Sequence, residues 1–367
     1  MDSSLRMSDF DYNLPQHLIA QTPIEPRDAS RLLVVDRGSE RMEHRHFRDI
    51  GDYLRPGDLL IANQSRVIPA RLLGKRAETG GSVEVLLLAE RPDLGRDCWE
   101  TLVRPGRRLR EGARILFEDA SNRVRLAGEI LQRTDAGGRI VRLAASESAQ
   151  HIPYADPYSF LTVRQLIDEL GKMPLPPYIH ETLADPERYQ TVYARIRGSA
   201  AAPTAGLHFT PQLLAQLRAQ GVRTGFVTLH VGLDTFRPVE HENISDHKMH
   251  SEEIDLDPDT AQLIQETRNA GGRVIAVGTT SVRVLESVAA LHDGNIAPYH
   301  GPTRLFITPG YRFQAVDAMI TNFHLPRSTL LLLVSAFMGK ALMEQVYQEA
   351  IREHYRFFSF GDAMLII

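Results

Sequence analysis

The sequence has a single cysteine, Cys98, among its 367 residues. One thiol excludes a disulfide within the chain and a cysteine-based metal centre, and this scarcity is typical of proteins from a reducing compartment. Long hydrophobic runs are also missing, because the longest, residues 330–338, falls far short of the roughly 20 residues of a membrane-spanning helix. No basic start followed by an apolar stretch marks a signal peptide. We therefore expect a cytoplasmic protein without a membrane segment.

An excess of positive charge is absent as well. The 42 lysines and arginines are outnumbered by 46 aspartates and glutamates, and the net charge is −4. A protein that binds nucleic acid through general electrostatics is usually basic, so any contact with RNA or DNA is expected to be local. Hydrophobic residues make up 43% of the chain, enough for full-sized cores, and a chain of this length predicts two domains.

Residues 75–150 contain short alternating apolar runs separated by glycines, with no competing helical period. Strands at this spacing, with turn signals between them, are typical of a small β-barrel. The flanking stretches predict strands that alternate with helices, which favours a mixed or largely parallel sheet. We predict an α/β protein in which a larger mixed α/β domain, residues 1–74 and 151–367, is interrupted by an inserted small β-barrel domain at residues 75–150.

Two helix starts in the second half of the chain carry strong capping signals. Thr210 and Asp257 each precede a proline, so a capping side chain is followed by a residue suited to the first helical position. Gly221 and Gly271 are expected to end these helices. The remaining predicted elements are helices at 47–54, at 281–291, from 328 and near 340, and strands at 32–36, 58–62, 225–231, 273–277, 315–320 and 363–367.

Polar side chains gather where four of these segments leave a strand or enter a helix. Ligands of α/β folds bind at such carboxyl ends of strands, and the free N–H groups of a helix start favour an anion. An ordinary structural role stays open for each segment: a packing loop, a core histidine, an N-cap or a turn. The four segments are Gly198–Thr210 with His208, Thr228–Phe236 with His230 and Gly232, Val277–Glu286 with its Gly-Thr-Thr-Ser turn, and Asp317–Pro326 with Asn322 and His324.

Other chemistry-bearing patterns are weaker. Arg283 and Glu286 lie three residues apart on a predicted helix and are placed to pair with each other. Arginines around Arg66 and Arg71, and from Arg104 onward, form local basic clusters that suit phosphate, although a solvated loop is the alternative. The stretch 240–250 is rich in histidine and acid but lacks His-Glu-x-x-His, so no metal site is expected.

Read together, these motifs closely resemble the S-adenosylmethionine:tRNA ribosyltransferase-isomerase family of queuosine biosynthesis. The most specific stretch is Ala201–Thr210, and the order of the motifs is preserved along almost the whole chain. The other matching stretches are Asp9–Tyr12, Leu18–Pro23, Pro26–Leu33, Ser65–Arg71, Leu102–Gly106, Pro174–Ile179, Glu187–Tyr193, His230–Gly232, Thr235–Phe236, Met249–Glu252, Gly278–Arg283 and Thr321–Thr329.

The resemblance implies a reaction on tRNA. The ribosyl part of S-adenosylmethionine is moved onto a 7-aminomethyl-7-deazaguanine at the wobble position and isomerised to an epoxycyclopentane, forming epoxyqueuosine-tRNA, while adenine and methionine leave. S-adenosylmethionine is then a consumed substrate, so no cofactor is expected, and we expect a monomer. The sulfonium acidifies the neighbouring 5′ C–H, so a base is required, and departing adenine benefits from a proton. Histidine suits either role at neutral pH.

The resemblance also implies a set of site residues. We expect one site that draws on the three histidines, with their roles unassigned, and the variant His208→Ala should lose turnover while the fold survives. Asp317 or Glu286 is expected to balance the sulfonium charge. The expected residues are His208, His230 and His324 for catalysis, Thr204, Gly206, Gly232, Thr279, Thr280, Ser281, Arg283, Asp317 and Asn322 for substrate, and Arg66, Arg71 and Arg104 for tRNA phosphates.

Asp234 departs from the pattern, because the family commonly has glycine there, and this leaves the shape of the local loop open. Two other functions also stay open. A catalytically silent tRNA-binding protein on the same fold would not need the histidines. A methyltransferase would release S-adenosylhomocysteine and would need a glycine-rich first strand–loop–helix, which the sequence does not contain.

Overall fold

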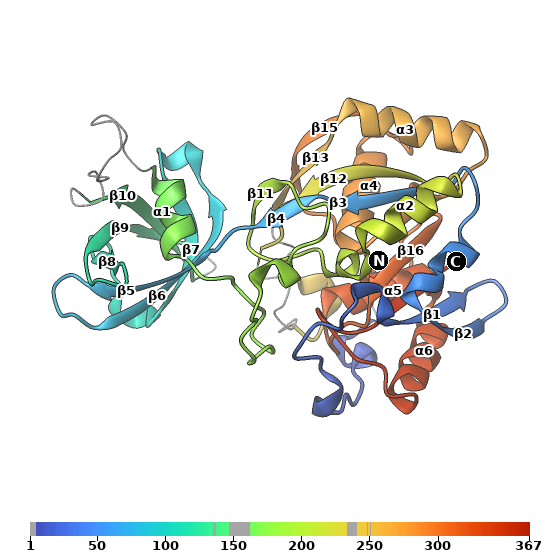
Figure 1. Ribbon diagram of the computed structural model, residues 1–367, viewed down its shortest axis with the longest axis horizontal. Coiled ribbons are helices and arrows are strands. Elements are labelled where there is room, and N and C mark those ends of the chain that lie inside the picture. Colours follow the sequence, from blue (N-terminus) through green and yellow to red (C-terminus); the bar gives the residue numbers. More distant parts are fainter. Residues whose placement is uncertain (1–4, 135–136, 147–161, 233–240, 248, 250) are drawn as a thin grey trace. The chain divides into compact units, whose positions relative to one another are not determined.

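The computed structural model describes residues 5–134, 137–146, 162–232, 241–247, 249 and 251–367. The chain divides into two compact units (Figure 1). The first comprises Met1–Arg66, Pro176–Ile196 and Ala202–Ile367, and the second comprises Val67–Leu175 and Arg197–Ala201. The first unit is mixed α/β and the second is a β-barrel, which confirms the predicted fold class. The domain limits expected from the sequence, at residues 74 and 150, remain a prediction about where separately folding domains begin.

The α/β unit is built on a nine-stranded sheet in the order β15-β13-β12-β3-β14-β16-β17-β1-β2. Four central strands, β12, β3, β14 and β16, run parallel, so their carboxyl ends meet at one edge of the sheet. β17 pairs antiparallel with β16 and parallel with β1, so both of these strands begin at that same edge. The strands are β1 (Arg31–Asp36), β2 (Arg41–His46), β3 (Leu59–Asn63), β12 (Arg223–Leu229), β13 (Glu252–Leu256), β14 (Val274–Val277), β15 (Tyr299–Thr303), β16 (Ala318–Asn322) and β17 (Ala363–Ile366).

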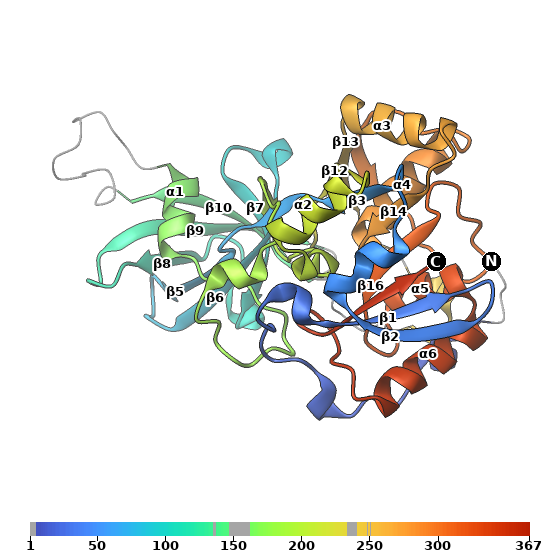
Figure 2. The ribbon, with the colours of Figure 1, turned by 45° about the vertical axis from the view of Figure 1, so that its right-hand side comes forward.

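Helices cover both faces of this sheet. Leu213 and Leu217 of α2 (Pro211–Ala219) pack with Leu60 of β3 in one core cluster. On the other face of the sheet, a Cβ added at Gly225 of β12 would meet side chains of α3 (Pro258–Asn269). The helices α2 and α3 therefore lie on either side of β12 and β3 (Figure 2). The predicted caps are confirmed, because the side chains of Thr210 and Asp257 accept backbone hydrogen bonds from the first turns of α2 and α3. The remaining α-helices of this unit are α4 (Thr279–Leu291), α5 (Thr329–Met338) and α6 (Lys340–Arg352).

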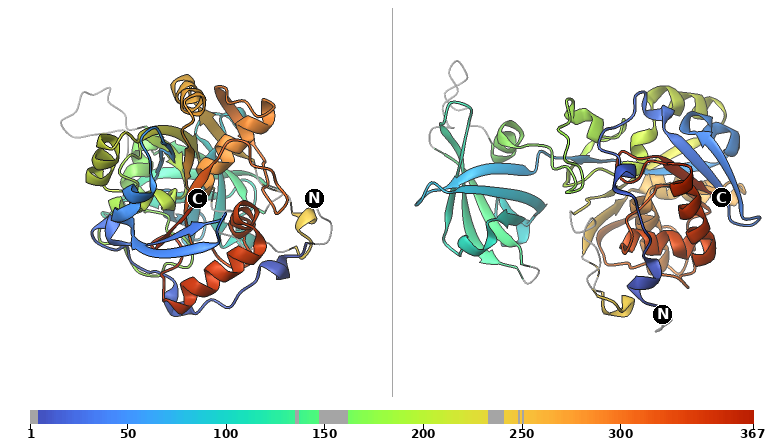
Figure 3. Two further views of the ribbon diagram at one scale, coloured as in Figure 1. Left: turned by 90° about the vertical axis from the view of Figure 1, so that its right-hand side faces the viewer. Right: turned by 90° about the horizontal axis from the view of Figure 1, so that it is seen from below.

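The barrel unit is a closed six-stranded antiparallel barrel, in the order β10-β7-β6-β5-β8-β9. Alternate side chains such as Leu72, Val85 and Phe117 point into one hydrophobic cluster, as the alternating sequence pattern predicts. Leu166 of α1 (Val163–Leu170) joins that cluster, and Figure 3 shows the strands curving around a common interior. The strands are β5 (Arg71–Arg76), β6 (Ser82–Glu90), β7 (Cys98–Arg104), β8 (Arg114–Glu118), β9 (Val124–Arg133) and β10 (Arg139–Ala145).

Two short strands, β4 (Ser65–Val67) and β11 (Ile196–Ser199), lie where the chain passes from one unit to the other. The predicted helix at 47–54 is a 3-10 helix. The described 3-10 helices are η1 (Met7–Phe10), η2 (Gln16–Leu18), η3 (Arg27–Ala29), η4 (Phe47–Tyr53), η5 (Pro92–Leu94), η6 (Gly106–Arg108), η8 (Pro186–Tyr189), η9 (Thr204–His208) and η11 (Ile244–Asp246).

Within the described ranges, no single helix combines the length and the hydropathy needed to cross a bilayer. The consecutive helices α5 and α6 meet both requirements only when taken together, and the chain bends by 114° between them.

Candidate functional site

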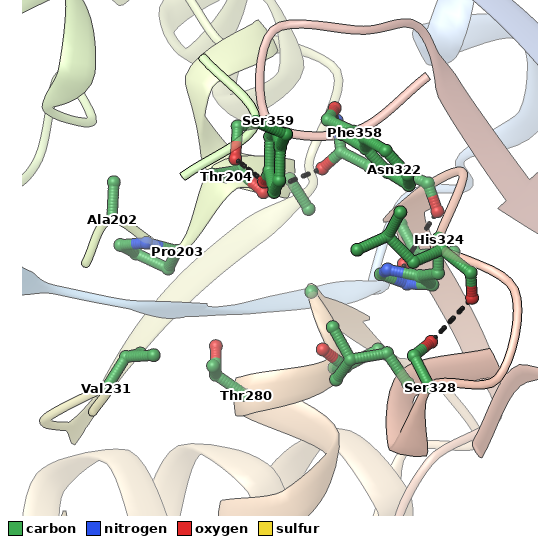
Figure 4. A pocket seen from close by; sticks show the side chains of 17 residues that line it. Ala202, Pro203, Thr204, Val231, Thr280, Asn322, His324, Ser328, Phe358 and Ser359 are labelled. Atoms are coloured by element: carbon green, nitrogen blue, oxygen red, sulfur yellow. Dashed lines mark hydrogen bonds between the residues drawn. The ribbon is translucent and has the colours of Figure 1, made fainter. Parts of the chain in front are cut away.

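A cavity opens at the edge of the sheet where the central parallel strands end (Figure 4). Its free volume is about 690 Å³, the part open to solvent included. Asn322 at the end of β16 and Thr279 at the start of α4 both line it, as do Thr204 on η9 and Ser328 at the start of α5. The topology therefore brings together segments that are more than 100 residues apart in the sequence.

Asn322 stands at the centre of a hydrogen-bond network in the wall of the cavity. Its Nδ2 donates to the carbonyl oxygen of Phe358 at 3.1 Å and lies 3.2 Å from Nε2 of His208. Its Oδ1 accepts a hydrogen bond from the hydroxyl of Thr204 at 3.2 Å. The carbonyl of Phe358 can only accept, so Nδ2 must be the amide nitrogen, and His208 must present the lone pair of Nε2 to it.

His208 is held in one tautomer by this network. With its lone pair on Nε2, the proton lies on Nδ1, which is 2.8 Å from the hydroxyl oxygen of Ser30. The ring stacks on Phe47 and is almost fully buried. Burial, with the nearby cations Arg356 and Arg27, lowers the pKa of His208 to about 3, so the ring is neutral at pH 7. His208 is not among the residues that line the cavity and lies behind Asn322.

His324 does line the cavity, and its ring points into it (Figure 4). Its backbone is held on two sides, since the carbonyl accepts from the hydroxyl of Tyr12 and the N–H donates to the hydroxyl of Tyr347 at 3.0 Å. Nε2 lies 2.8 Å from Oγ1 of Thr321, and no described residue pairs with Nδ1. Burial lowers the pKa of His324 to about 3. The cavity is therefore lined by a neutral imidazole with one nitrogen left for a ligand.

The N-terminus of α4 supplies the polar floor of the cavity. Gly278 forms the N-cap at φ 88°, a backbone conformation that favours glycine, so no capping side chain occupies the first turn. Thr279 and Thr280 follow and both line the cavity. Oγ1 of Thr280 is buried and has no hydrogen-bond partner in the described part of the chain, and Figure 4 shows its side chain directed toward the cavity. An anion bound here gains both the helix N–H groups and this hydroxyl.

Several residues expected at the site are placed elsewhere. Ser281 donates to the carbonyl of Val277 at 2.8 Å and caps nothing, since α4 begins two residues earlier. Arg283 pairs with Glu252 and not with Glu286. Neither Ser281 nor Arg283 is a lining residue of the cavity, because the helix carries them past its first turn.

Asp317 and Glu286 also lie away from the cavity. Asp317 immediately precedes β16, whereas the cavity lies at the other end of that strand, and its carboxylate accepts from the N–H of Val274 at 2.7 Å. Glu286 accepts backbone hydrogen bonds from Gln314, Ala315 and Val316. Both carboxylates therefore fix the loop and strand starts at the opposite edge of the sheet, and neither is placed to balance a sulfonium in the cavity.

His230, Gly206 and Gly232 were also expected at the site, but none of them lines the cavity. His230 follows β12 and does not line the cavity, although its neighbour Val231 does, and Nδ1 of His230 is buried without a partner in the described residues. A Cβ at Gly206 would lie 2.1 Å from the hydroxyl of Tyr193, so this glycine permits close packing of η9. Gly232 has open space around it, and Asp234 lies outside the described residues.

The three arginines expected to contact tRNA differ in their partners. Arg66 pairs with Glu187, a carboxylate that is itself 60% exposed. Arg71 pairs with Glu84 at 2.6 Å on the outside of the barrel, and Arg104 lies across from Glu84 in the β6–β7 pairing. Exposed pairs of this kind stabilise little and exchange readily for another anion.

Sequence reasoning missed the far wall of the cavity. Tyr178, Phe358 and Ser359 line it, and the hydroxyls of Tyr178 and Ser359 lie 2.7 Å apart. Phe358 has φ 71°, which is rare for a bulky side chain and marks strain at this wall. The stretch Phe358-Ser-Phe-Gly361, just before the last strand, was the available signal, since Gly361 permits a tight turn where a Cβ would meet the carbonyl of Arg356 at 2.4 Å.

The chain is similar to known proteins along almost its whole length. Residues 7–366 match the family model described as queuosine biosynthesis protein. The chain is 57% identical to the S-adenosylmethionine:tRNA ribosyltransferase-isomerase of Symbiobacterium thermophilum, over 99% of this chain and 100% of that one. It is 54% identical to the protein of the same name from Heliobacterium modesticaldum, over 98% of each. The crystal structure of S-adenosylmethionine tRNA ribosyltransferase from Thermotoga maritima is similar at a TM-score of 0.55 and 40% identity, over 98% of this chain and 100% of that one.

Proposed function

Because the chain belongs to the S-adenosylmethionine:tRNA ribosyltransferase-isomerase family of queuosine biosynthesis, we propose that the cavity at the carboxyl edge of the sheet is its S-adenosylmethionine site. The chain is an enzyme of this activity, a transferase and isomerase in tRNA modification. The observation that carries the proposal is the unpartnered, buried hydroxyl of Thr280 at the open N-terminus of α4, on the lining of this cavity.

The methionine carboxylate of the substrate binds at this helix start. Free N–H groups at the first turn of α4 carry partial positive charge, and Thr279 and Thr280 add hydroxyl donors. The ribose and adenine then extend toward Asn322 and the wall formed by Tyr178 and Phe358. Aromatic and apolar side chains in this wall suit the adenine ring, which must be held and then released.

His324 acts on the reacting carbon. Burial keeps its imidazole neutral, so no second cation lies beside the sulfonium when the substrate binds, and the ring takes up the 5′ proton while the sulfonium becomes an ylide. If the hydroxyl proton of Thr321 goes to the carbonyl of Asn322, which lies 3.3 Å away, the ring donates from Nε2 and the lone pair is on Nδ1. This is the state that a general base at the acidified 5′ C–H requires.

His208 positions Asn322. It lies behind the cavity wall and presents its lone pair to the amide of Asn322, so it fixes which atom of that side chain faces the substrate. Its effect on turnover is therefore indirect. His230, which does not line the cavity, has no role in this proposal.

The second substrate is a tRNA that carries 7-aminomethyl-7-deazaguanine at the wobble position. Its phosphates contact Arg66, Arg71 and Arg104; the ion pairs of Arg66 with Glu187 and of Arg71 with Glu84 lie at the surface and compete weakly with a phosphodiester. We infer a monomer located in the cytoplasm, where the tRNA is found.

Release of adenine tests the proposed function. The purified enzyme, S-adenosylmethionine and tRNA with the aminomethyl-deazaguanine base should yield adenine and methionine in equal amounts, because one C–N and one C–S bond of each substrate molecule break. The control is the same tRNA with guanine at the wobble position, which lacks the attacking amine and should yield no adenine. S-adenosylhomocysteine as the product would identify a methyltransferase, and an intact base with no adenine would identify a silent binder.

A further inference from the structure

A second, smaller cavity lies behind the first, and Ser359 lines both of them. Its free volume is about 260 Å³, the part open to solvent included. Arg27 and Arg188 line it, together with His208 and the backbone turn at Phe360 and Gly361. The proposed reaction gives this cavity no role.

Arg27 is a partly buried guanidinium without a carboxylate partner in the described part of the chain. Its Nη1 donates to the carbonyl of Leu207 at 3.3 Å and its Nη2 to the carbonyl of Glu187 at 3.0 Å. A guanidinium has five N–H donors, so these two contacts leave donors for a further acceptor. The carbonyl contacts also fix the orientation of the guanidinium group.

The second arginine strengthens the positive field in this cavity. Arg188 is held by the carbonyl of Ile24 at 2.6 Å and by Glu25 at 3.0 Å, and its side chain is only 17% exposed. The carboxylates of the region, Glu25, Glu187 and Asp185, lie on the outer side, since the side chains of Glu25 and Glu187 are 74% and 60% exposed. Arg188 repels the charge on Arg27, and an anion between the two guanidinium groups would remove that repulsion.

We propose that Arg27 and Arg188 form an oxyanion site that takes a phosphodiester of the bound RNA, next to the nucleotide whose base enters the first cavity. Guanidinium groups favour phosphate because they donate two parallel hydrogen bonds to it. The shared wall at Ser359 puts the two cavities close enough for one nucleotide to reach both. This inference rests on the proposed function, which makes RNA a substrate of the enzyme.

A carboxylate is the other oxyanion available, namely that of the methionyl group of S-adenosylmethionine. The start of α4 already offers that carboxylate a site inside the larger cavity. The phosphodiester is the occupant that these observations favour.

The test compares Arg27→Gln and Arg188→Gln with Arg352→Gln, a control whose side chain is 70% exposed on α6. Binding of tRNA with the aminomethyl-deazaguanine base is measured by filter retention at several salt concentrations. Loss of one phosphate contact should weaken binding about tenfold and should reduce the slope of log K against log salt by about 0.7 to 0.9. The control should keep the wild-type slope.

The KM for S-adenosylmethionine shows whether the site of Arg27 and Arg188 takes the RNA phosphodiester or the methionyl carboxylate. A KM within about twofold of the wild type, with the reduced salt slope, supports the phosphodiester site. A raised KM with unchanged tRNA binding would overturn it in favour of the carboxylate, and unchanged values of both would show that Arg27 only ties loops together. If Arg27→Gln folds poorly, Arg27→Lys is the second variant. It keeps the positive charge, so its salt slope should equal that of the wild type. Because tRNA retention needs no turnover, failure of this inference is distinct from absence of adenine release.

Discussion

At the scale of single residues, Asn322 joins the substrate cavity to the rest of the fold. Both N–H groups of its amide are used, because they donate to Phe358 and His208, and its oxygen accepts from Thr204 with one lone pair left. A buried amide with all its partners has one orientation, and removal of any partner leaves a buried polar group unpaired. The side chain of His208 is therefore important for the cavity although it does not line it.

The variants His208→Gln and His208→Ala test this positioning role. Alanine leaves one N–H of the Asn322 amide without an acceptor, so kcat should fall by about tenfold or more. Glutamine offers a carbonyl oxygen to the same amide and should restore part of the activity. The pH profile of kcat/KM decides the role, because a positioning residue leaves its acid limb in place. If the acid limb vanishes in His208→Gln, His208 itself titrates during catalysis and the assignment is wrong.

At the scale of elements, η9 is the segment that places Thr204 in the cavity and His208 behind it. It packs against the sheet only because Gly206 has no side chain at the point where Tyr193 crosses it. Gly278 has the related role of starting α4 without a capping side chain, which leaves the first turn free. Two glycines thus shape the cavity without contacting a substrate through side chains.

The variant Gly206→Ala should destabilise the protein by about 1 to 3 kcal/mol. The added Cβ would lie 2.1 Å from the hydroxyl of Tyr193 and 2.8 Å from Cγ2 of Thr191, so η9 must move. Chemical unfolding measures the change. Gly106→Ala is the matched control, because nothing lies within 4 Å of its added Cβ and its stability should stay within about 0.5 kcal/mol of the wild type. Equal stabilities of the two variants would contradict the close packing.

At the scale of the whole molecule, the α/β unit holds two neutral histidines, His208 buried and His324 partly exposed. An unfolded chain binds protons at His208 and His324 below pH 6.5, whereas the folded protein binds them only near pH 3. Their contribution to stability is therefore fully present above pH 6.5 and is lost as the pH falls toward 3. Protonation of Nε2 of His208 in the folded state would also break its hydrogen bond with the amide of Asn322.

Acid should therefore destabilise the enzyme in this window. Each histidine adds at most about 1.4 kcal/mol per pH unit to the slope of the unfolding free energy between pH 6.5 and 3. Unfolding in denaturant at pH 7, 6 and 5 measures this slope. In His208→Gln the slope should be smaller by up to about 1.4 kcal/mol per pH unit, the equivalent of one proton fewer taken up on unfolding. A slope for His208→Gln equal to that of the wild type would contradict the lowered pKa of His208.

The local sequence determined much of the fold. Capping residues such as Thr210 and Asp257, and apolar runs such as β3 and β14, act through neighbours along the chain, so the elements they specify were predictable. The edge strands β2 and β15, and β13 next to β15, were not predicted, because their residues are largely polar and become strands only through pairing with a neighbour.

The site shows the same division between sequence and structure. The sequence by itself determined the family, the class of reaction and the segments that meet at the end of the sheet, because motif order and strand ends can be read locally. Only the tertiary structure decided which side chain of each segment faces the cavity. It placed His324 and Thr280 on the wall, His208 behind Asn322, and Asp317 at the far end of β16. The physical reason is that strand direction and long-range hydrogen bonds fix the direction of a side chain, and neither is encoded in a single segment.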